Sequence, residues 1–192
     1  MNAPDGPSLL PLFLKLEGRT ALVVGAGAVA ERKIAALLDA GALVRVVAPE
    51  ASDAVRTLAA EGRVEWRARA FEDADLDGAW LAFAATSDAV VQRGVAESAA
   101  ARRVFCVAVD DPPNASAYSG AVVRRPPFAI AVSSSGAAPA LTRLVREVLE
   151  SALPSDDWIA RAEQLRARWL AEKTPMQDRF EQLVRELRTP RP

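Results

Sequence analysis

The stretch TALVVGAGAVAERKIAALLDAGALVRVVAPE, residues 20–50, decides the fold of this 192-residue chain. A continuous apolar run at 21–25 ends in glycine, which is typical of a buried parallel strand. Apolar residues then recur at helical spacing through 28–40, and a second, predominantly apolar stretch, ALVRVVA, follows at 42–48. The stretch therefore predicts a strand, a glycine turn, a helix and a second, parallel strand.

The glycine turn has the pattern G-x-G-x-x-A and runs from Gly25 to Ala30. Gly25 permits a tight turn, and Gly27 lets the backbone approach a pyrophosphate. The helix that begins at Ala28 and Val29 points its positive end at such an anion. We predict that these four residues bind a dinucleotide, with a purely structural turn as the alternative.

The end of the second strand lacks the acidic residue that usually binds the ribose of the cofactor. Ala48 and Pro49 occupy this position, and Glu50 follows directly. We expect these three residues to contact the cofactor, either through the Glu50 carboxylate or through backbone groups. NAD is the expected cofactor, but Arg45 and Lys33 leave a 2′-phosphate, and therefore NADP, open.

Further strands are expected at 63–69, 80–86 and 103–109, with helices at 49–60 and 88–101 and an acidic loop at 71–79. This alternation predicts a Rossmann-like, doubly wound parallel sheet. A small α+β segment follows, with two strands around Arg124–Pro127 and a helix over 138–152. Two amphipathic helices, at 155–171 and 175–188, complete the chain. The expected domains are 1–112 for NAD binding, 113–152 for dimerisation and 153–192 for a helical region.

Polar residues follow two of the central strands at the edge of the sheet where ligands bind in such folds. Thr86 and Ser87 follow one strand and are expected to contact the cofactor. The alternative for Ser87, or for Asp88, is that it caps the next helix. Asp110 follows the last strand, where it is either a general acid or base or part of an Asp-Asp-Pro-Pro turn.

Composition excludes several classes of function. The chain has no histidine, which removes Ser-His triads and the commonest metal ligand, so Asp110 is the best available base. Its single cysteine, Cys106, cannot form an internal disulfide and agrees with a cytoplasmic location. A net charge of −1 argues against nucleic-acid binding. We find neither a signal-peptide pattern nor an apolar run of the roughly 18 residues that a membrane span needs.

The sequence resembles the precorrin-2 dehydrogenase / sirohydrochlorin ferrochelatase family, including the N-terminal module of sirohaem synthase. The matching pieces are LPLFLKLEGRTALVVGAGAVAERKIAALLDAGA, WLAFAATSDAVVQRGVAE, RRVFCVAVDD and RRPPFAIAVSSSGAAPALTRLVREVLES. They follow one another over roughly residues 10–155. The chain departs from the family pattern at Val107, where the family usually has asparagine, at Ser135, and in the segment around Tyr118.

The resemblance implies NAD-dependent oxidation of precorrin-2 to sirohydrochlorin and, in some members, insertion of Fe²⁺ as a second substrate. It also implies a homodimer, with Asp110 as the essential carboxylate. Ser134 corresponds to a family serine, and Arg124, Arg125 and Arg143 lie where they would bind the acidic tetrapyrrole. No residue is assigned to a resident metal. Two alternatives stay open: a related Rossmann enzyme for another acidic tetrapyrrole, and a nucleotide-sensing dimer that docks a partner.

Overall fold

The computed structural model describes residues 9–153 and 156–188. The chain divides into two compact units, with the division between Ser119 and Gly120. The first unit carries the glycine turn and Asp110, whereas the second carries Ser134 and the three arginines expected to bind substrate. The three-part division expected from the sequence, with limits at residues 112 and 152, stays a prediction.

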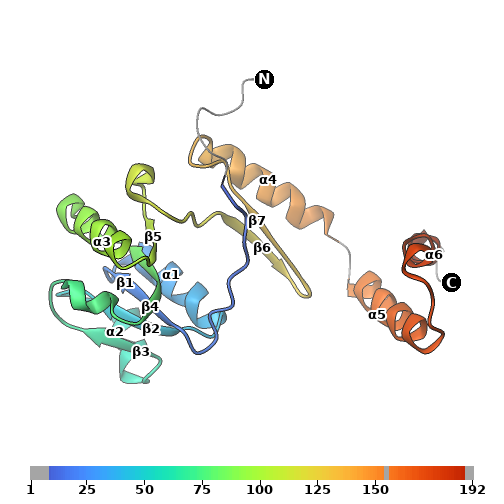
Figure 1. Cartoon of the computed structure of the whole chain (residues 1–192), viewed down its shortest axis with the longest axis horizontal. Coiled ribbons are helices and arrows are strands. Elements are labelled where there is room, and N and C mark those ends of the chain that lie inside the picture. Colours follow the sequence, from blue (N-terminus) through green and yellow to red (C-terminus); the bar gives the residue numbers. More distant parts are fainter. Residues whose placement is uncertain (1–8, 154–155, 189–192) are drawn as a thin grey trace. The chain divides into compact units, whose positions relative to one another are not determined.

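The first unit is built on a five-stranded parallel sheet, in the order β3-β2-β1-β4-β5 (Figure 1). The strands are β1 (Thr20–Val24), β2 (Leu43–Val47), β3 (Val64–Arg67), β4 (Ala79–Ala84) and β5 (Phe105–Ala108). This arrangement confirms the predicted Rossmann-like sheet and places β3 at an edge. The strand order reverses between β1 and β4, so a ligand crevice is expected at the carboxyl ends of these two strands.

Helices cover both faces of this sheet. The helical segments are α1 (Ala28–Asp39), α2 (Asp53–Ala60), the short 3-10 helix η1 (Asp73–Leu76), α3 (Ala89–Ala101) and the 3-10 turn η2 (Pro112–Asn114). Ile34 of α1 and Val55 of α2 pack with Val23 in one layer of the core. Val95 of α3 and Leu76 of η1 pack on the opposite face. The central strand β1 is therefore buried on both faces of the sheet, as its continuous apolar run predicted.

Two local expectations need correction. The helix expected from Pro49 begins only at Asp53, because Ser52 caps it by accepting a hydrogen bond from the Val55 N–H at 3.4 Å. The acidic loop expected at 71–79 contains η1, and its Asp75 side chain is fully buried.

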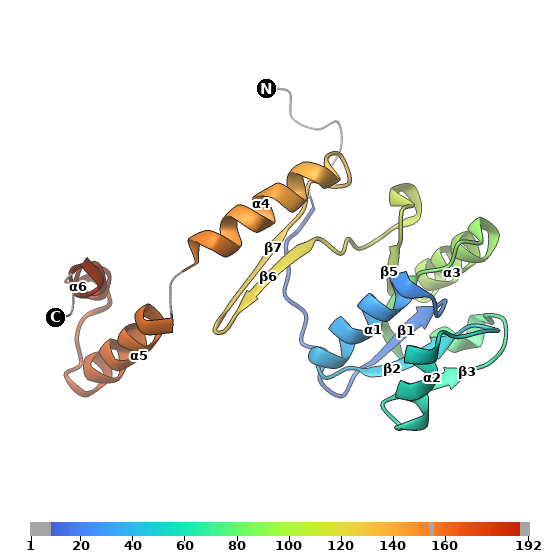
Figure 2. The ribbon, with the colours of Figure 1, turned by 180° about the vertical axis from the view of Figure 1, so that it is seen from behind.

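The second unit begins with the antiparallel hairpin of β6 (Ala121–Arg125) and β7 (Phe128–Val132). Helix α4 (Pro139–Ala152) packs along this hairpin (Figure 2). The sequence places five apolar residues on one face of α4. Leu149 is partly buried, but the other four remain exposed: Leu141, Leu144, Val145 and Val148. The pattern thus predicted the helix correctly, but this single chain does not bury the apolar face.

Helices α5 (Asp156–Ala171) and α6 (Met176–Arg188) contact one another, and both lie where the sequence predicts them. Leu165 and Trp169 are buried, and the Trp169 indole N–H donates to Gln182 at 2.6 Å. Nowhere in the described parts of the chain is a helix both long and apolar enough to cross a membrane.

Candidate nucleotide and substrate site

The first glycine of the turn is required by the close approach of two strand ends. Gly25 has a left-handed backbone with a φ of 107°, and its N–H donates to the Val47 carbonyl at 2.9 Å. A Cβ atom at this position would overlap the backbone carbonyl of Ala85, just beyond β4. Only glycine therefore allows the turn at the point where the strand order reverses.

The second glycine leaves the start of α1 open. Gly27 precedes the helix and has no side chain to cap it, and a Cβ atom placed there would meet nothing within 4 Å. The first N–H groups of the helix, including those of Ala28 and Val29, have no intrahelical acceptor. Open space beside unpaired N–H groups fits the pyrophosphate of a dinucleotide, which these residues would hold.

The end of β2 lies against this turn. The Ser52 N–H donates to the Ala26 carbonyl at 3.1 Å, which ties the loop after β2 to the turn. Ala48 is buried, and its carbonyl accepts a hydrogen bond from the Trp66 indole at 3.1 Å. Pro49 and Glu50 are exposed at the surface of the loop. Their contacts with the cofactor stay predictions.

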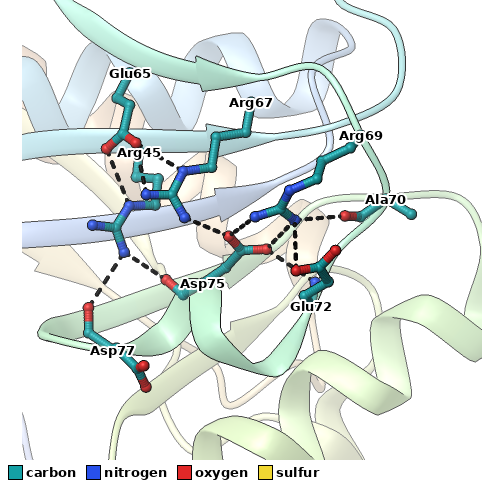
Figure 3. Close-up of polar contacts among 8 residues, drawn as sticks. All are labelled: Arg45, Glu65, Arg67, Arg69, Ala70, Glu72, Asp75 and Asp77. Carbon is teal, nitrogen blue, oxygen red and sulfur yellow. Dashed lines mark hydrogen bonds and ion pairs between the residues drawn. The ribbon is translucent and has the colours of Figure 1, made fainter.

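Arg45, one of the two cations that left NADP open, belongs to an ion cluster around the buried Asp75 (Figure 3). It donates to Glu65 at 3.2 Å and to the Asp75 carbonyl at 2.8 Å. Arg67 and Arg69 both bind the Asp75 carboxylate at 2.7 Å. Arg45 is thus occupied by protein partners and does not favour a 2′-phosphate.

Asp75 is the centre of this cluster, which the sequence analysis did not find. Burial acts to raise the pKa of Asp75. Hydrogen bonds from Arg69, the Glu72 N–H and Arg67 outweigh burial and lower this pKa to about 2. The sequence predicted a strand at 63–69, but it did not show that Arg67 and Arg69 converge on a residue of the next loop.

At the end of β4, the structure distinguishes the two candidate caps. The Asp88 carboxylate accepts hydrogen bonds from the N–H groups of Val90 and Val91 at 2.8 and 3.2 Å, so Asp88 caps α3. The Thr86 hydroxyl accepts a hydrogen bond from the Asp88 N–H at 3.2 Å, and Ser87 is exposed. Ser87 is therefore not the cap, and contacts of Thr86 and Ser87 with a cofactor stay predictions.

Asp110 is exposed just beyond β5, at the same edge of the sheet as the glycine turn. Its backbone is left-handed, with a φ of 59°, so it lies in a sharp turn. The buried Gln92 of α3 donates to the Val109 carbonyl at 2.6 Å and fixes the residue before this turn. Sequence reasoning missed Gln92, because an amide within an amphipathic helix carries no signal of its partner.

Lys33 of α1 lies near Asp110. Its ammonium group donates to the Ser119 hydroxyl at 3.0 Å and lies 5.8 Å from the centre of the Phe83 ring. Burial lowers the pKa of Lys33, as does the nearby charge of Arg32, while the charge of Asp110 acts to raise it. A partly desolvated cation and a carboxylate thus share this edge of the sheet.

The four residues expected to bind substrate all lie in the second unit. The Ser134 hydroxyl accepts hydrogen bonds from the Ala138 N–H at 3.1 Å and from the Thr142 hydroxyl at 2.8 Å, which fixes the loop before α4. Arg125 donates to the Leu153 carbonyl at 3.2 Å, and Arg143 pairs with Glu147 at 3.0 Å. Arg124 is exposed on β6. Substrate binding by these residues stays a prediction.

The described residues contain no group of three or more His, Cys, Asp or Glu side chains that could hold a metal ion. Cys106 is buried in β5, and burial raises the pKa of its thiol. Its surroundings are those of a small core residue.

Known proteins resemble the chain over most of its length. Siroheme synthase 3 of Aeromonas hydrophila is 46% identical over 145 residues, which are 76% of this chain and 31% of that protein. Siroheme synthase of Actinobacillus pleuropneumoniae is 40% identical over 179 residues, 93% of this chain and 36% of that one. The chain thus spans about a third of the length of these curated relatives.

A solved structure, SirC, precorrin-2 dehydrogenase, matches with a TM-score of 0.75 over 92% of this chain and 88% of that chain. The identity is 24%, so this likeness supports the fold. Residues 127–152 match the family model described as sirohaem biosynthesis protein central. Residues 12–121, more than half of the chain, match the model described as putative NAD(P)-binding, and the chain therefore belongs to this NAD(P)-binding family.

Proposed function

We propose that the chain oxidises precorrin-2 to sirohydrochlorin with NAD as the hydride acceptor. The observation that carries the proposal is the placement of Asp110 at the same sheet edge as the open N-terminus of α1, in a chain whose curated relatives are siroheme synthases. An exposed carboxylate beside a dinucleotide site suits a reaction that removes a hydride and a proton from one substrate.

The oxidation breaks a C–H bond of the tetrapyrrole, and the hydride reduces NAD⁺ to NADH. A proton leaves the substrate at the same time, and Asp110 is the group proposed to accept it. The α1 N-terminus and the glycine turn hold the pyrophosphate, which fixes the nicotinamide relative to the sheet edge.

The test is an absorbance time course with purified protein, precorrin-2 and NAD. Sirohydrochlorin that forms only with NAD supports the proposal. The matched variant is Asp110→Asn, because asparagine tolerates the left-handed backbone that Asp110 adopts. We expect Asp110→Asn to lose turnover at least about 100-fold, within the range typical of general acid–base catalysis, and to bind NAD normally.

Absence of turnover in a folded wild-type protein that binds NAD would overturn the dehydrogenase proposal and favour the nucleotide-sensing alternative. Turnover of Asp110→Asn at the wild-type rate would overturn the role of Asp110. Insertion of Fe²⁺ stays a prediction from the resemblance. A second time course with Fe²⁺ or Co²⁺ tests it, since an absorbance change above the no-enzyme control would establish chelation.

We also propose that the chain forms a homodimer through α4. The proposal is supported by the four apolar residues that α4 leaves exposed along one face, Leu141, Leu144, Val145 and Val148. Such a face is what a self-complementary interface between two copies would bury.

A further inference from the structure

We propose that Lys33 binds a carboxylate of the substrate beside Asp110 and so contributes to substrate affinity. The inference rests on the proposed function, because it requires a polycarboxylate ligand at this sheet edge.

The ammonium group of Lys33 has capacity for another acceptor. A lysine ammonium carries three N–H donors, and the Ser119 hydroxyl accepts one of them. The ion pairs among the described residues are all made by arginines, and none involves Lys33. Lys33 is therefore partly buried without a carboxylate partner in direct contact, a state that an incoming carboxylate would stabilise.

The position of Lys33 favours the substrate over the cofactor. Its ammonium lies over Phe83 of β4, which pairs with both Val23 of β1 and Val107 of β5, and it touches Ser119 in the segment after β5. The contact with Ser119 and the interaction of its charge with that of Asp110 place the ammonium near the residues that follow β5. The pyrophosphate is expected instead at Gly27, at the start of the same helix.

Lys33 differs from the arginines of the ion cluster around Asp75. Arg67 and Arg69 have a structural role, and both are bound to the buried Asp75. Among the residues that the structure describes, Lys33 contacts a hydroxyl and an aromatic face, which restrict its position without neutralising its charge. A cation that is positioned but not neutralised is suited to bind an anionic ligand.

The test compares Lys33→Gln, Lys33→Arg and the control Arg32→Gln, which removes a neighbouring charge at an exposed position. We expect Lys33→Gln to raise the KM for precorrin-2 about tenfold or more, as loss of one charge-assisted contact does. Its kcat should stay within about threefold of wild type, and its Kd for NAD should not change. Lys33→Arg should restore most of the KM, and Arg32→Gln should change it less than about twofold.

An unchanged KM for precorrin-2 in Lys33→Gln would overturn the proposed role of Lys33, whether or not the variant binds NAD more weakly. A separate binding measurement keeps the inference independent of turnover. Fluorescence titration with uroporphyrin, a polycarboxylate porphyrin, should show weaker binding to Lys33→Gln than to wild type. If wild-type protein fails to oxidise precorrin-2 but binds uroporphyrin through Lys33, the proposed role of Lys33 stands and the dehydrogenase proposal fails. Equal uroporphyrin affinities for wild type and Lys33→Gln would overturn that role itself.

Discussion

Asp75, fully buried between β3 and β4, accepts two hydrogen bonds from the guanidinium of Arg69, at 2.7 and 2.8 Å. Arg67 donates to the same carboxylate at 2.7 Å. The connection from β3 to β4 contains only the short η1 rather than a full crossover helix. The ionic contact with the buried Asp75 therefore holds this connection on the sheet. Leu76 of η1 adds an apolar contact with the core.

We expect Asp75→Asn to lower the free energy of unfolding of the first unit by about 2–3 kcal/mol. The variant leaves two arginines without their carboxylate, but both are partly exposed, so water offsets some of the loss. Glu61→Gln is the control, because Glu61 makes only an exposed pair with Arg63 and its change should stay within about 0.5 kcal/mol. Urea unfolding curves measure both, and equal midpoints for the two variants would contradict a structural role of the cluster.

The stability that Asp75 contributes should depend on pH. Its pKa is about 2 in the folded chain against 3.8 ordinarily, so the folded state favours the ionised form. The contribution, about 2 kcal/mol, is then present above pH 4 and is lost as the pH falls toward 2. The unfolding free energies of wild type and Asp75→Asn, measured from pH 5 to pH 3, should converge as the pH falls. A constant difference over this range would contradict the assignment.

The two glycines of the turn should respond differently to alanine. Gly25→Ala forces a Cβ atom against the Ala85 carbonyl at a left-handed backbone position, so the variant should lose several kcal/mol of stability or fail to fold. Gly27→Ala meets no protein atom and should stay within about 1 kcal/mol of wild type. Its methyl group would instead occupy the space expected for the pyrophosphate, and we expect NAD affinity to fall at least tenfold.

Thermal unfolding and calorimetric titration with NAD separate these two effects. Gly27→Ala that binds NAD like wild type would show that the anion does not approach this residue. Gly25→Ala with wild-type stability would show instead that the turn can adjust to a side chain.

The sequence predicted the elements of the sheet well, because predominantly apolar runs such as 21–25 and 42–48 have few alternative structures. It also predicted the glycine turn, since Gly25 and Gly27 are required by local backbone geometry. These features depend on residues close together in the chain. A single sequence is therefore sufficient to predict these features.

The features that it missed depend on contacts between distant residues. Asp75 looks like one of several acids in a loop, and only the folded chain shows that Arg67 and Arg69 converge on it. Gln92 and Lys33 are polar residues in amphipathic helices, where exposure is the usual expectation. Their contacts with Val109 and Ser119 form only when α3 and α1 pack on the sheet.

Gln92 should affect the rate of catalysis indirectly, because it holds the Val109 carbonyl next to Asp110. Gln92→Leu removes the hydrogen bond to the Val109 carbonyl and leaves that acceptor without its amide partner, which should lower stability by about 1–2 kcal/mol. Misplacement of Asp110 should lower kcat by tenfold or more, while the Kd for NAD stays near the wild-type value. Steady-state kinetics and calorimetry test this, and an unchanged kcat would mean that the Asp110 turn is held without Gln92.

We expect dimerisation to depend on the apolar face of α4. Leu144 is 55% exposed at the centre of the apolar face of α4, so Leu144→Glu would place a charge in the proposed interface. We expect a shift from dimer to monomer in sedimentation velocity, with a dissociation constant raised about 100-fold. Leu170→Glu is the matched control, because Leu170 is 63% exposed on α5 and lies outside that face. If both variants remain dimers, α4 is not the interface, and if only Leu170→Glu dissociates, the dimer forms through α5 instead.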